Sequence, residues 1–308
     1  MRIAVIGSGA VGSFYGARLG RAGHDVRFLM RRDYEAVRRN GLTVRSCDGD
    51  FRFPAKVFAR SEEIGPVDLV ICALKTTALD AAPGLIRPCL GPDTEVLALM
   101  NGLGVEDRFA QWFGAERVFG GLAFVCINRG EPGVVNHYGY GRVAIGHFRD
   151  DAARARRIAA LFAEAGFETS VPPSLLQARW EKLVWNIPFS TLAVSAGGVP
   201  TSRIMADEGL RGLARLLMTE VIAAGNADGC HIEEEPLIRK MFEDTATMGD
   251  YRPSMLIDYV EKKPLEVESI LGEPVRRALR LGVPVPHVDM QYRLVCFLDR
   301  LNRGEASG

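Results

Sequence analysis

A glycine-rich segment at residues 7–12, directly after a short apolar run, constrains the fold of this chain most. Residues 2–6 have the composition of a β-strand, and residues 10–22 have the pattern of a helix. Glycines in this context suit a tight turn, close approach of the backbone to a pyrophosphate and close packing of the helix on the strand. The alternative is a glycine-rich turn without a ligand. The context favours a dinucleotide site formed by Gly7, Ser8, Gly9, Ala10, Val11 and Gly12.

The segments that follow alternate between strand and helix patterns, which is typical of a parallel sheet covered by helices. A second strand is expected at residues 25–30 and a helix at 152–165. Residues 42–47 and 51–58 flank Asp48-Gly49-Asp50, which predicts a hairpin at the edge of the sheet. Further strands are predicted at residues 67–74, 95–100, 118–127 and 134–145.

The pattern changes at Pro172-Pro173, and the remaining sequence reads as helices. We therefore expect two domains, residues 1–172 as an NADP-binding Rossmann domain and residues 173–308 as a helical substrate-binding domain. The predicted fold class is an α/β N-terminal Rossmann-type dinucleotide-binding domain plus an all-α C-terminal domain. The helices are predicted at residues 175–194, 204–227, 235–247, 253–262, 266–281 and 287–302.

Composition excludes several classes of function. The 38 basic and 38 acidic side chains cancel, which argues against a nucleic-acid partner. No apolar run is long enough to span a membrane, and the first residues lack the pattern of a signal peptide. The six cysteines show no Cys-x-x-Cys pair, so neither a zinc site nor a disulfide framework is expected, and no metal is predicted. A reduced, cytoplasmic protein is the expectation.

The choice between NAD and NADP depends on the end of the second strand, where an acid binds the ribose hydroxyl and a base accepts the 2′-phosphate. Here Arg31 and Arg32 follow the strand directly, which favours NADP(H). The alternative is that both arginines are solvated and that Asp33 selects NAD. Which of the two arginines would hold the phosphate stays open.

Two polar residues follow other predicted strands at the edge where α/β sheets bind ligands. Lys75 would reach a phosphate, a ribose or the nicotinamide amide, and Asn101 would order its loop or contact the cofactor. A surface lysine and a turn asparagine are the alternatives.

A hydride carrier needs a partner that handles the proton. Lys182, Asn186 and Ser190 recur every four residues, so they lie on one face of a helix in apolar surroundings. Desolvation lowers the pKa of such a lysine and suits it to give a proton near neutral pH. The alternative is a lysine that reaches solvent from a core helix, and His137 stays a second candidate.

Ser254 and Glu266 stand at the expected starts of two later helices. A carboxylate ligand would find free backbone amides beside Ser254. Both residue types are also common in the first turn of any helix, and spacing alone does not separate these interpretations.

Together these residues resemble the ketopantoate reductase (2-dehydropantoate 2-reductase) family. They follow the family order over almost the whole chain. The glycine motif is common to many dehydrogenases, whereas the Lys182 to Asn186 block combined with Ser254 and Glu266 is far more specific. The matching segments are Gly7-x-Gly9-Ala10-x-Gly12, Arg31, Leu74-Lys75, Asn101-Gly102-x-Gly104, Lys182-Leu183-x-x-Asn186, Ser254-Met255 and Glu266.

The resemblance implies an NADPH-dependent reductase whose helical domain is of the 6-phosphogluconate dehydrogenase C-terminal type, and which makes (R)-pantoate for pantothenate synthesis. It implies that Lys182 is the general acid and that Arg31 holds the 2′-phosphate. The remaining implied contacts are Asn186, Ser190 and Ser254 to the substrate, and Lys75, Asn101, Cys126 and Glu266 to the cofactor side.

One position departs from the family pattern. Ser190 stands where biosynthetic members often carry a second asparagine, and serine lacks the paired donor and acceptor of an amide. Reduction of another 2-oxo acid therefore stays an alternative, as does a non-catalytic NADPH-binding sensor. The apolar helices of the second half would also permit a homodimer, although a helical core explains them equally well.

Overall fold

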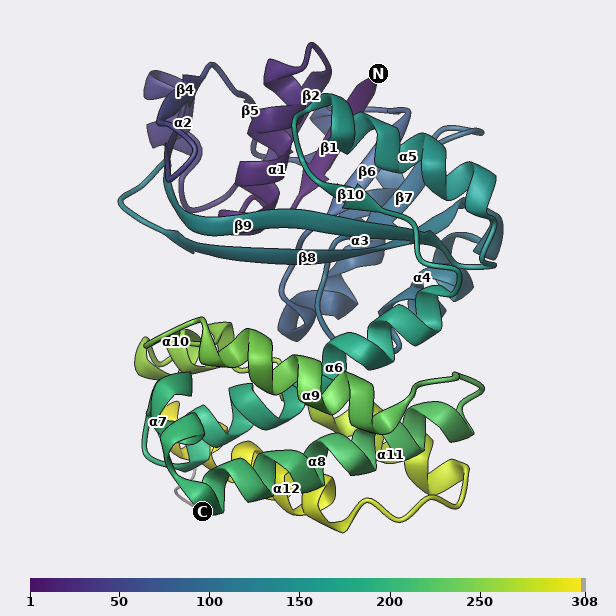
Figure 1. Ribbon diagram of the computed structural model, residues 1–308. Coiled ribbons are helices and arrows are strands. Elements are labelled where there is room, and N and C mark those ends of the chain that lie inside the picture. Colours follow the sequence, from purple (N-terminus) through teal and green to yellow (C-terminus); the bar gives the residue numbers. More distant parts are fainter. Residues whose placement is uncertain (306–308) are drawn as a thin grey trace. The chain divides into compact units, whose positions relative to one another are not determined.

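The computed structural model describes residues 1–305 and divides the chain into two compact units (Figure 1). The first unit comprises residues 1–100 and 105–175. The second comprises residues 101–104 and the chain from Leu176 onward. The short segment 101–104 thus belongs to the second unit, although it follows a strand of the first.

The first unit is built on a mixed sheet with the strand order β4-β3-β9-β8-β7-β6-β1-β2-β5, and β10 pairs with β9. Its central strands are parallel and apolar because helices cover both faces. The strands are β1 (Arg2–Ile6), β2 (Asp25–Leu29), β3 (Leu42–Ser46), β4 (Phe51–Phe53), β5 (Lys56–Phe58), β6 (Leu69–Cys72), β7 (Glu95–Ala98), β8 (Val118–Arg129), β9 (Val134–His147) and β10 (Thr169–Ser170).

Side chains alternate across this sheet as the two-residue period of a strand requires. Ile3 and Val5 of β1 pack in one cluster with α1 (Ala10–Arg21) and α5 (Ala152–Glu164), whereas Ala4 and Ile6 pack on the other face with α3 (Ala82–Ile86) and α4 (Val105–Phe113). Four 3₁₀ turns and a short helix complete the unit, at Ser61–Glu63, Thr76–Ala81, Arg87–Cys89, Ala115–Arg117 and α2 (Tyr34–Asn40).

Strands β8 and β9 form a long antiparallel hairpin that crosses the first unit (Figure 1). Its register shifts between Phe124 and Val125 and again between Cys126 and Ile127. Such irregularities bend a strand and increase its twist. Beyond the hairpin, β3 pairs in parallel with β9, and β4 ends the sheet.

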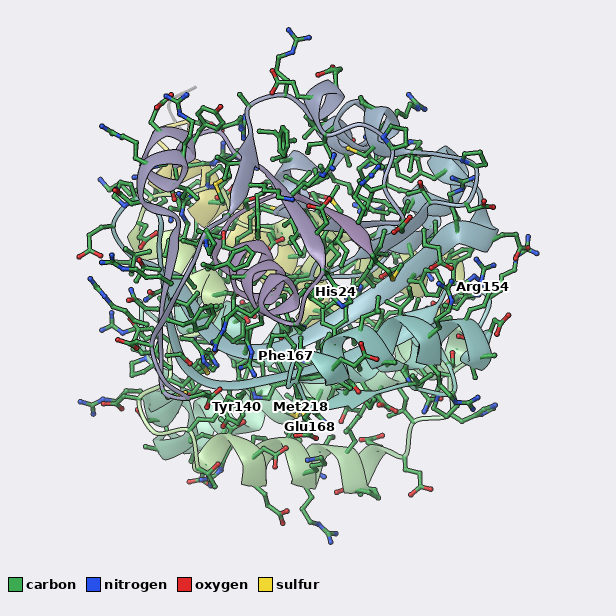
Figure 2. All side chains as sticks on the ribbon, turned by 90° about the horizontal axis from the view of Figure 1, so that it is seen from above. His24, Tyr140, Arg154, Phe167, Glu168 and Met218 are labelled. Carbon is green, nitrogen blue, oxygen red and sulfur yellow. The ribbon has the colours of Figure 1, made fainter. Side chains whose placement is uncertain are left out.

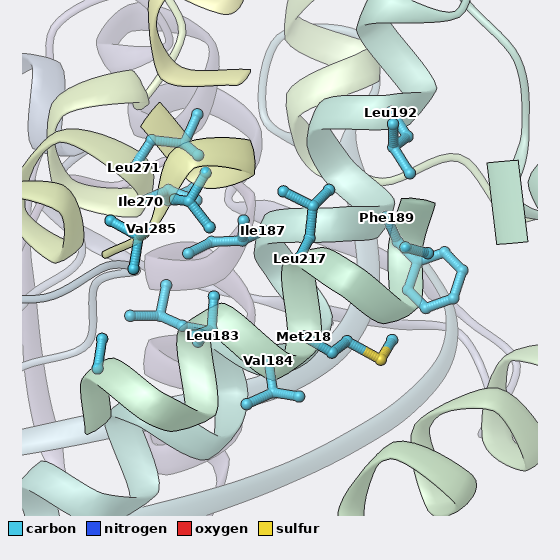
Figure 3. Close-up of a cluster of buried hydrophobic side chains, with 14 of the residues drawn as sticks. Leu183, Val184, Ile187, Phe189, Leu192, Leu217, Met218, Ile270, Leu271 and Val285 are labelled. Atoms are coloured by element: carbon cyan, nitrogen blue, oxygen red, sulfur yellow. The ribbon is translucent and has the colours of Figure 1, made fainter. Parts of the chain in front are cut away.

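The second unit is entirely helical in its described residues, and its core surrounds α6 (Leu175–Ser195). Figure 3 shows Leu183 and Ile187 of α6 among side chains of α8 (Glu208–Ala227) and of the segment around Ile270. The other helices are α7 (Thr201–Ala206), α9 (Glu234–Ala246), α10 (Ser254–Val260), the π-helical turn Glu268–Gly272, α11 (Glu273–Arg280) and α12 (Pro286–Asn302).

The fold class expected from the sequence is confirmed, and two of the expected elements are wrong. Residues 51–58 are not one strand: Pro54 interrupts them, and β4 and β5 lie at opposite ends of the sheet. Residues 204–227 are not one helix, because Asp207 has extended backbone angles and caps α8 with its carboxylate. No helix among residues 1–305 combines the length and apolar character that a membrane span needs.

Candidate active site

The glycine loop of the first unit has the geometry that a pyrophosphate requires. Gly7 has a φ of 94°, and a Cβ there would lie 2.5 Å from the backbone nitrogen of Leu74. A Cβ on Gly12 would lie 2.4 Å from the carbonyl oxygen of Gly7. A Cβ on Gly9, the N-cap of α1, would meet nothing within 4 Å. Two glycines are thus required by packing, and the third leaves the helix N-terminus open to an anion.

Hydroxyl groups hold this loop against the second strand. Ser8 donates to the carbonyl of Leu29 at 2.9 Å, and Ser13 donates to the carbonyl of Ser8 at 3.2 Å. The glycine loop is therefore tied to the strand that leads into Arg31.

Arg31 and Arg32 are both exposed, while Asp33 is largely covered. Asp33 accepts from Arg129 at 2.5 Å through Oδ2, and its Oδ1 is buried away from solvent. Neither oxygen of Asp33 is therefore available to a ribose hydroxyl. The side chains of Arg31 and Arg32, by contrast, are exposed. The strand end thus exposes positive rather than negative charge.

Lys75 and Cys126 complete the predicted cofactor residues of the first unit. Lys75 is exposed and is the N-cap of the 3₁₀ turn after β6. Cys126 is half-buried on β8, at one of the two register shifts. The position of Lys75 at a carboxyl strand end suits a ligand contact.

In the second unit, Lys182 of α6 donates from Nζ to Oδ1 of Asn101 at 3.0 Å. From the sequence, Asn101 is expected to be either a turn residue or a ligand contact. The structure makes it a neighbour of the proposed acid.

Burial lowers the pKa of Lys182 to about 7. Desolvation is the main cause, the positive charge of Arg179 lowers the pKa further, and the carboxylate of Glu266 acts in the opposite direction. Glu266 is itself 5% exposed. The result is an ammonium group that releases its proton near neutral pH.

The other predicted substrate residues occupy different surroundings. Asn186 is half-buried and Ser190 is 4% exposed, one and two turns beyond Lys182 on α6. Ser254 is exposed and is the first residue of α10. The helix continues through Pro188, so the four-residue spacing of Lys182, Asn186 and Ser190 is preserved.

Two residues that the sequence analysis missed lie in this region. Arg179 is buried one helical turn before Lys182, and its charge acts on the lysine. Ser269 lies in the π-helical turn that follows Glu266, and its carbonyl accepts from the backbone amide of Leu103 at 2.8 Å. The i, i+3 spacing of Arg179 and Lys182 was readable, but no spacing connects Ser269 with residue 103. Short π-helical segments are frequent at functional sites.

Each unit therefore carries its own group of candidate site residues. The first has an open helix N-terminus and exposed cations, which suit an anionic ligand. The second offers a lysine poised to give a proton, with an amide and a carboxylate as neighbours.

The comparisons with known proteins agree with this chemistry. A family model described as ketopantoate reductase PanE/ApbA matches residues 3–150, and the model of its C-terminal part matches residues 174–299. The chain is 39% identical to the 2-dehydropantoate 2-reductase of Nostoc sp., over 98% of this chain and 96% of the relative. It is 47% identical to the crystal structure of 2-dehydropantoate 2-reductase from Geobacter metallireducens, with a TM-score of 0.93, over 96% and 99% of the two chains.

A more distant structure shares the fold alone. D-mandelate dehydrogenase, solved with NADH and anilino(oxo)acetate, is 22% identical with a TM-score of 0.91, over 98% and 99% of the two chains. The fold by itself therefore does not determine the substrate.

Proposed function

Because this chain belongs to the ketopantoate reductase family, we propose that it reduces 2-dehydropantoate to (R)-pantoate in pantothenate synthesis, with Lys182 as the proton donor. It is an oxidoreductase that acts on a keto group. The observation that carries the assignment of Lys182 is its lowered pKa of about 7 beside Asn101 and Glu266.

The residues of the second unit account for the proton transfer. Bound NADPH supplies the hydride for the keto carbon, and negative charge develops on the keto oxygen. Lys182 in its ammonium form gives the proton on Nζ to that oxygen and becomes neutral, which desolvation favours. Asn101 accepts a hydrogen bond from the ammonium group and orients it. Glu266 supports the protonated form before the transfer.

The preferred cofactor is NADPH. Arg31 holds the 2′-phosphate, and the open N-terminus of α1 at Gly9 receives the pyrophosphate. Asp33 forms an ion pair with Arg129, so it is not available to the ribose hydroxyl of NADH, which supports NADPH. The remaining cofactor contacts assigned to this site are Gly7, Ser8, Ala10, Val11, Gly12, Lys75, Asn101, Cys126 and Glu266.

Asn186, Ser190 and Ser254 bind the substrate in this proposal. Residues 1–172 form the cofactor domain, and residues 173–308 form the substrate domain.

A second candidate function is reduction of another 2-oxo acid on the same scaffold. It stays open because Ser190 carries a hydroxyl where biosynthetic members often carry an amide. The shared fold of D-mandelate dehydrogenase supports keeping it.

We assign the protein to the cytoplasm, supported by its six free cysteines.

We also infer that it forms a homodimer through α12. Met290, Leu294, Phe297 and Leu301 are 49%, 39%, 48% and 53% exposed, and they recur at intervals of four, three and four residues along one face of the helix. This spacing is that of a helix that packs against a second helix.

The decisive experiment measures oxidation of reduced nicotinamide with 2-dehydropantoate and a panel of other 2-oxo acids, using NADPH and NADH in parallel. Efficient turnover of 2-dehydropantoate with NADPH alone is expected. Preference for another acid would move the assignment to the second candidate and direct attention to Ser190. Tight NADPH binding without turnover of any acid would contradict the proposal and favour a sensor.

A further inference from the structure

Three side chains of metal-binding types converge in the first unit, outside the residues assigned to reduction. Cys47 and Asp48 lie in the exposed turn after β3, and His137 lies on β9. The backbone brings them together: β3 pairs with β9 so that Ser46 is opposite His137, and the amide of Cys47 donates to the carbonyl of His137 at 3.1 Å.

The imidazole of His137 is oriented for coordination through Nδ1. Its Nε2 lies 2.9 Å from the carbonyl oxygen of Tyr140 and 3.1 Å from that of Gly139. Carbonyl oxygens only accept, so Nε2 carries the proton and Nδ1 presents a lone pair. The ring is buried 4.5 Å from the ring of Phe14. Tyr140, whose carbonyl oxygen contacts Nε2, is labelled in Figure 2. Metal-binding histidines typically have this second hydrogen bond to a carbonyl.

The spacing of the ligand atoms is close to what a tetrahedral ion needs. The sulfur of Cys47 lies 3.7 Å from Nδ1 of His137 and 3.7 Å from Oδ1 of Asp48, and Oδ2 of Asp48 lies 3.9 Å from Nδ1. Zinc bonds of about 2.3 Å to sulfur and about 2.0 Å to nitrogen or oxygen place such ligands roughly 3.3 to 3.6 Å apart. The three ligand atoms therefore lie only a few tenths of an ångström farther apart than a bound ion would hold them.

The charges of the cluster also favour a cation. Asp48 brings a carboxylate to the cluster, and a divalent cation would be attracted to its negative charge. Two existing contacts must yield: Ser46 donates to Nδ1 at 2.8 Å, and Arg18 lies 3.5 Å from Asp48. Ser46 must turn to another rotamer, because its Oγ lies where the ion would bind Nδ1, and this turn also breaks its bond from the Asp48 amide. Arg18 keeps its bonds to two backbone carbonyls.

We propose that Cys47, Asp48 and His137 bind one zinc ion, with water as the fourth ligand. The Cys47 thiol releases its proton to solvent as the Zn–S bond forms, and no redox change occurs. Arg18, beside Asp48, lies nine residues beyond Gly9 on α1, about 13 Å along the helix, so the site is separate from the pyrophosphate loop. The ion joins the turn after β3 to β9 and stabilises this end of the sheet.

The test uses cobalt(II) as a spectroscopic probe on the full-length protein, followed by competition with zinc. The wild-type protein is expected to show a thiolate-to-cobalt charge-transfer band that zinc abolishes, with release of about one proton per ion near neutral pH. Cys47→Ser is expected to lose the band, and Asp48→Asn is expected to weaken zinc binding by at least about tenfold. Cys296→Ser, a half-buried cysteine of the second unit, is the matched control and keeps the band.

Two results would overturn the zinc site. One is a wild-type protein without a charge-transfer band. The other is a band that persists unchanged in Cys47→Ser, which would place the ion elsewhere. Cys47 and Asp48 are exposed, so their variants are expected to fold, and an unchanged far-ultraviolet circular dichroism spectrum checks this. Added zinc is expected to raise the melting temperature of the wild type and of Cys296→Ser only. This measurement is independent of reductase activity.

Discussion

Lys182 meets two opposing demands at the scale of a single residue. A buried ammonium group is costly to the folded state, and the same burial makes its proton available near neutral pH. Asn101 is the partner that keeps this amine in one orientation. Replacing Lys182 by an apolar residue is therefore expected to lower activity and to raise the stability of the fold.

The pH dependence of reduction follows from the protonated state of Lys182. With a pKa of about 7, the lysine is charged and able to give a proton below that pH, and neutral above it. We expect kcat/KM for reduction to be highest below pH 7 and to fall about tenfold per pH unit well above it. A steady-state pH profile with 2-dehydropantoate measures this, and a flat profile up to pH 9 would contradict the role.

Replacement Lys182→Met is expected to abolish most activity and to stabilise the fold. The folded pKa lies below the usual value of 10.5, so the unfolded chain binds the extra proton between these limits. The penalty is complete below pH 7 and disappears as the pH rises toward 10.5. We therefore expect a higher melting temperature for the variant at pH 6, a difference that shrinks by pH 10, and a kcat reduced about 10² to 10⁴-fold. Equal stability at both pH values would argue against a buried charge.

Arg31→Ala tests cofactor choice at the same scale. Loss of a phosphate-binding cation is expected to raise KM for NADPH by about tenfold or more while KM for NADH changes little. Arg32→Ala is the matched comparison, because both arginines are exposed at the same strand end. An equal effect of Arg31→Ala on both cofactors would remove the assignment to the 2′-phosphate.

At the scale of elements, the segment 101–104 depends on a close contact with the π-helical turn Glu268–Gly272. Gly102 has a φ of 90°, and a Cβ there would lie 2.4 Å from Cβ of Ser269. Since Asn101 adjoins this glycine, the contact sets where the partner of Lys182 is held. Ser269 of this turn contacts Gly102, while Glu266, just before the turn, acts on the charge of Lys182.

Gly102→Ala is expected to lower kcat and stability together. Gly229→Ala is its control, since Gly229 has a φ of 94° in the same unit but open space around its Cβ. Backbone strain alone costs about 1 to 3 kcal/mol in both variants. The additional loss in Gly102→Ala, measured by denaturant unfolding and kcat, reports the clash with Ser269. Identical losses in the two variants would show that the contact is unimportant.

At the scale of the whole molecule, assembly depends on surfaces that each unit leaves exposed. The face of α12 that carries Met290, Leu294, Phe297 and Leu301 is the longest regular series among the exposed large apolar residues of the described chain. Burial of this face against a second copy would remove apolar surface from water, which stabilises a dimer.

Phe297→Glu is expected to convert the dimer to a monomer, because a charge would be buried in the α12 contact. Leu216→Glu on α8 is the matched control, since both side chains are 48% exposed and only Phe297 belongs to the α12 face. Light scattering coupled to gel filtration measures the mass of each variant. A monomeric wild type would exclude the dimer, and dimers in both variants would place the contact elsewhere.

Much of this protein was readable from local patterns. The strand and helix of the glycine loop, the helical second half and the face shared by Lys182, Asn186 and Ser190 depend on periods of two to four residues, which sequence displays directly. The missed elements depend on distant partners. Residues 56–58 pair with residues 27–29 of β2, a distant partner that no local spacing in the sequence indicates.

The sequence by itself therefore determined the class of fold, the glycine loop between β1 and α1 and the identity of the polar residues available for chemistry. Tertiary structure decided which of them meet: Asn101 with Lys182, Ser269 with the loop at Gly102, and Cys47 with His137 across 90 residues of chain. The physical reason is the distance along the chain over which each kind of interaction acts. Backbone geometry couples a residue to neighbours within one or two turns, whereas contacts between distant residues form only when the whole chain buries its apolar surface together.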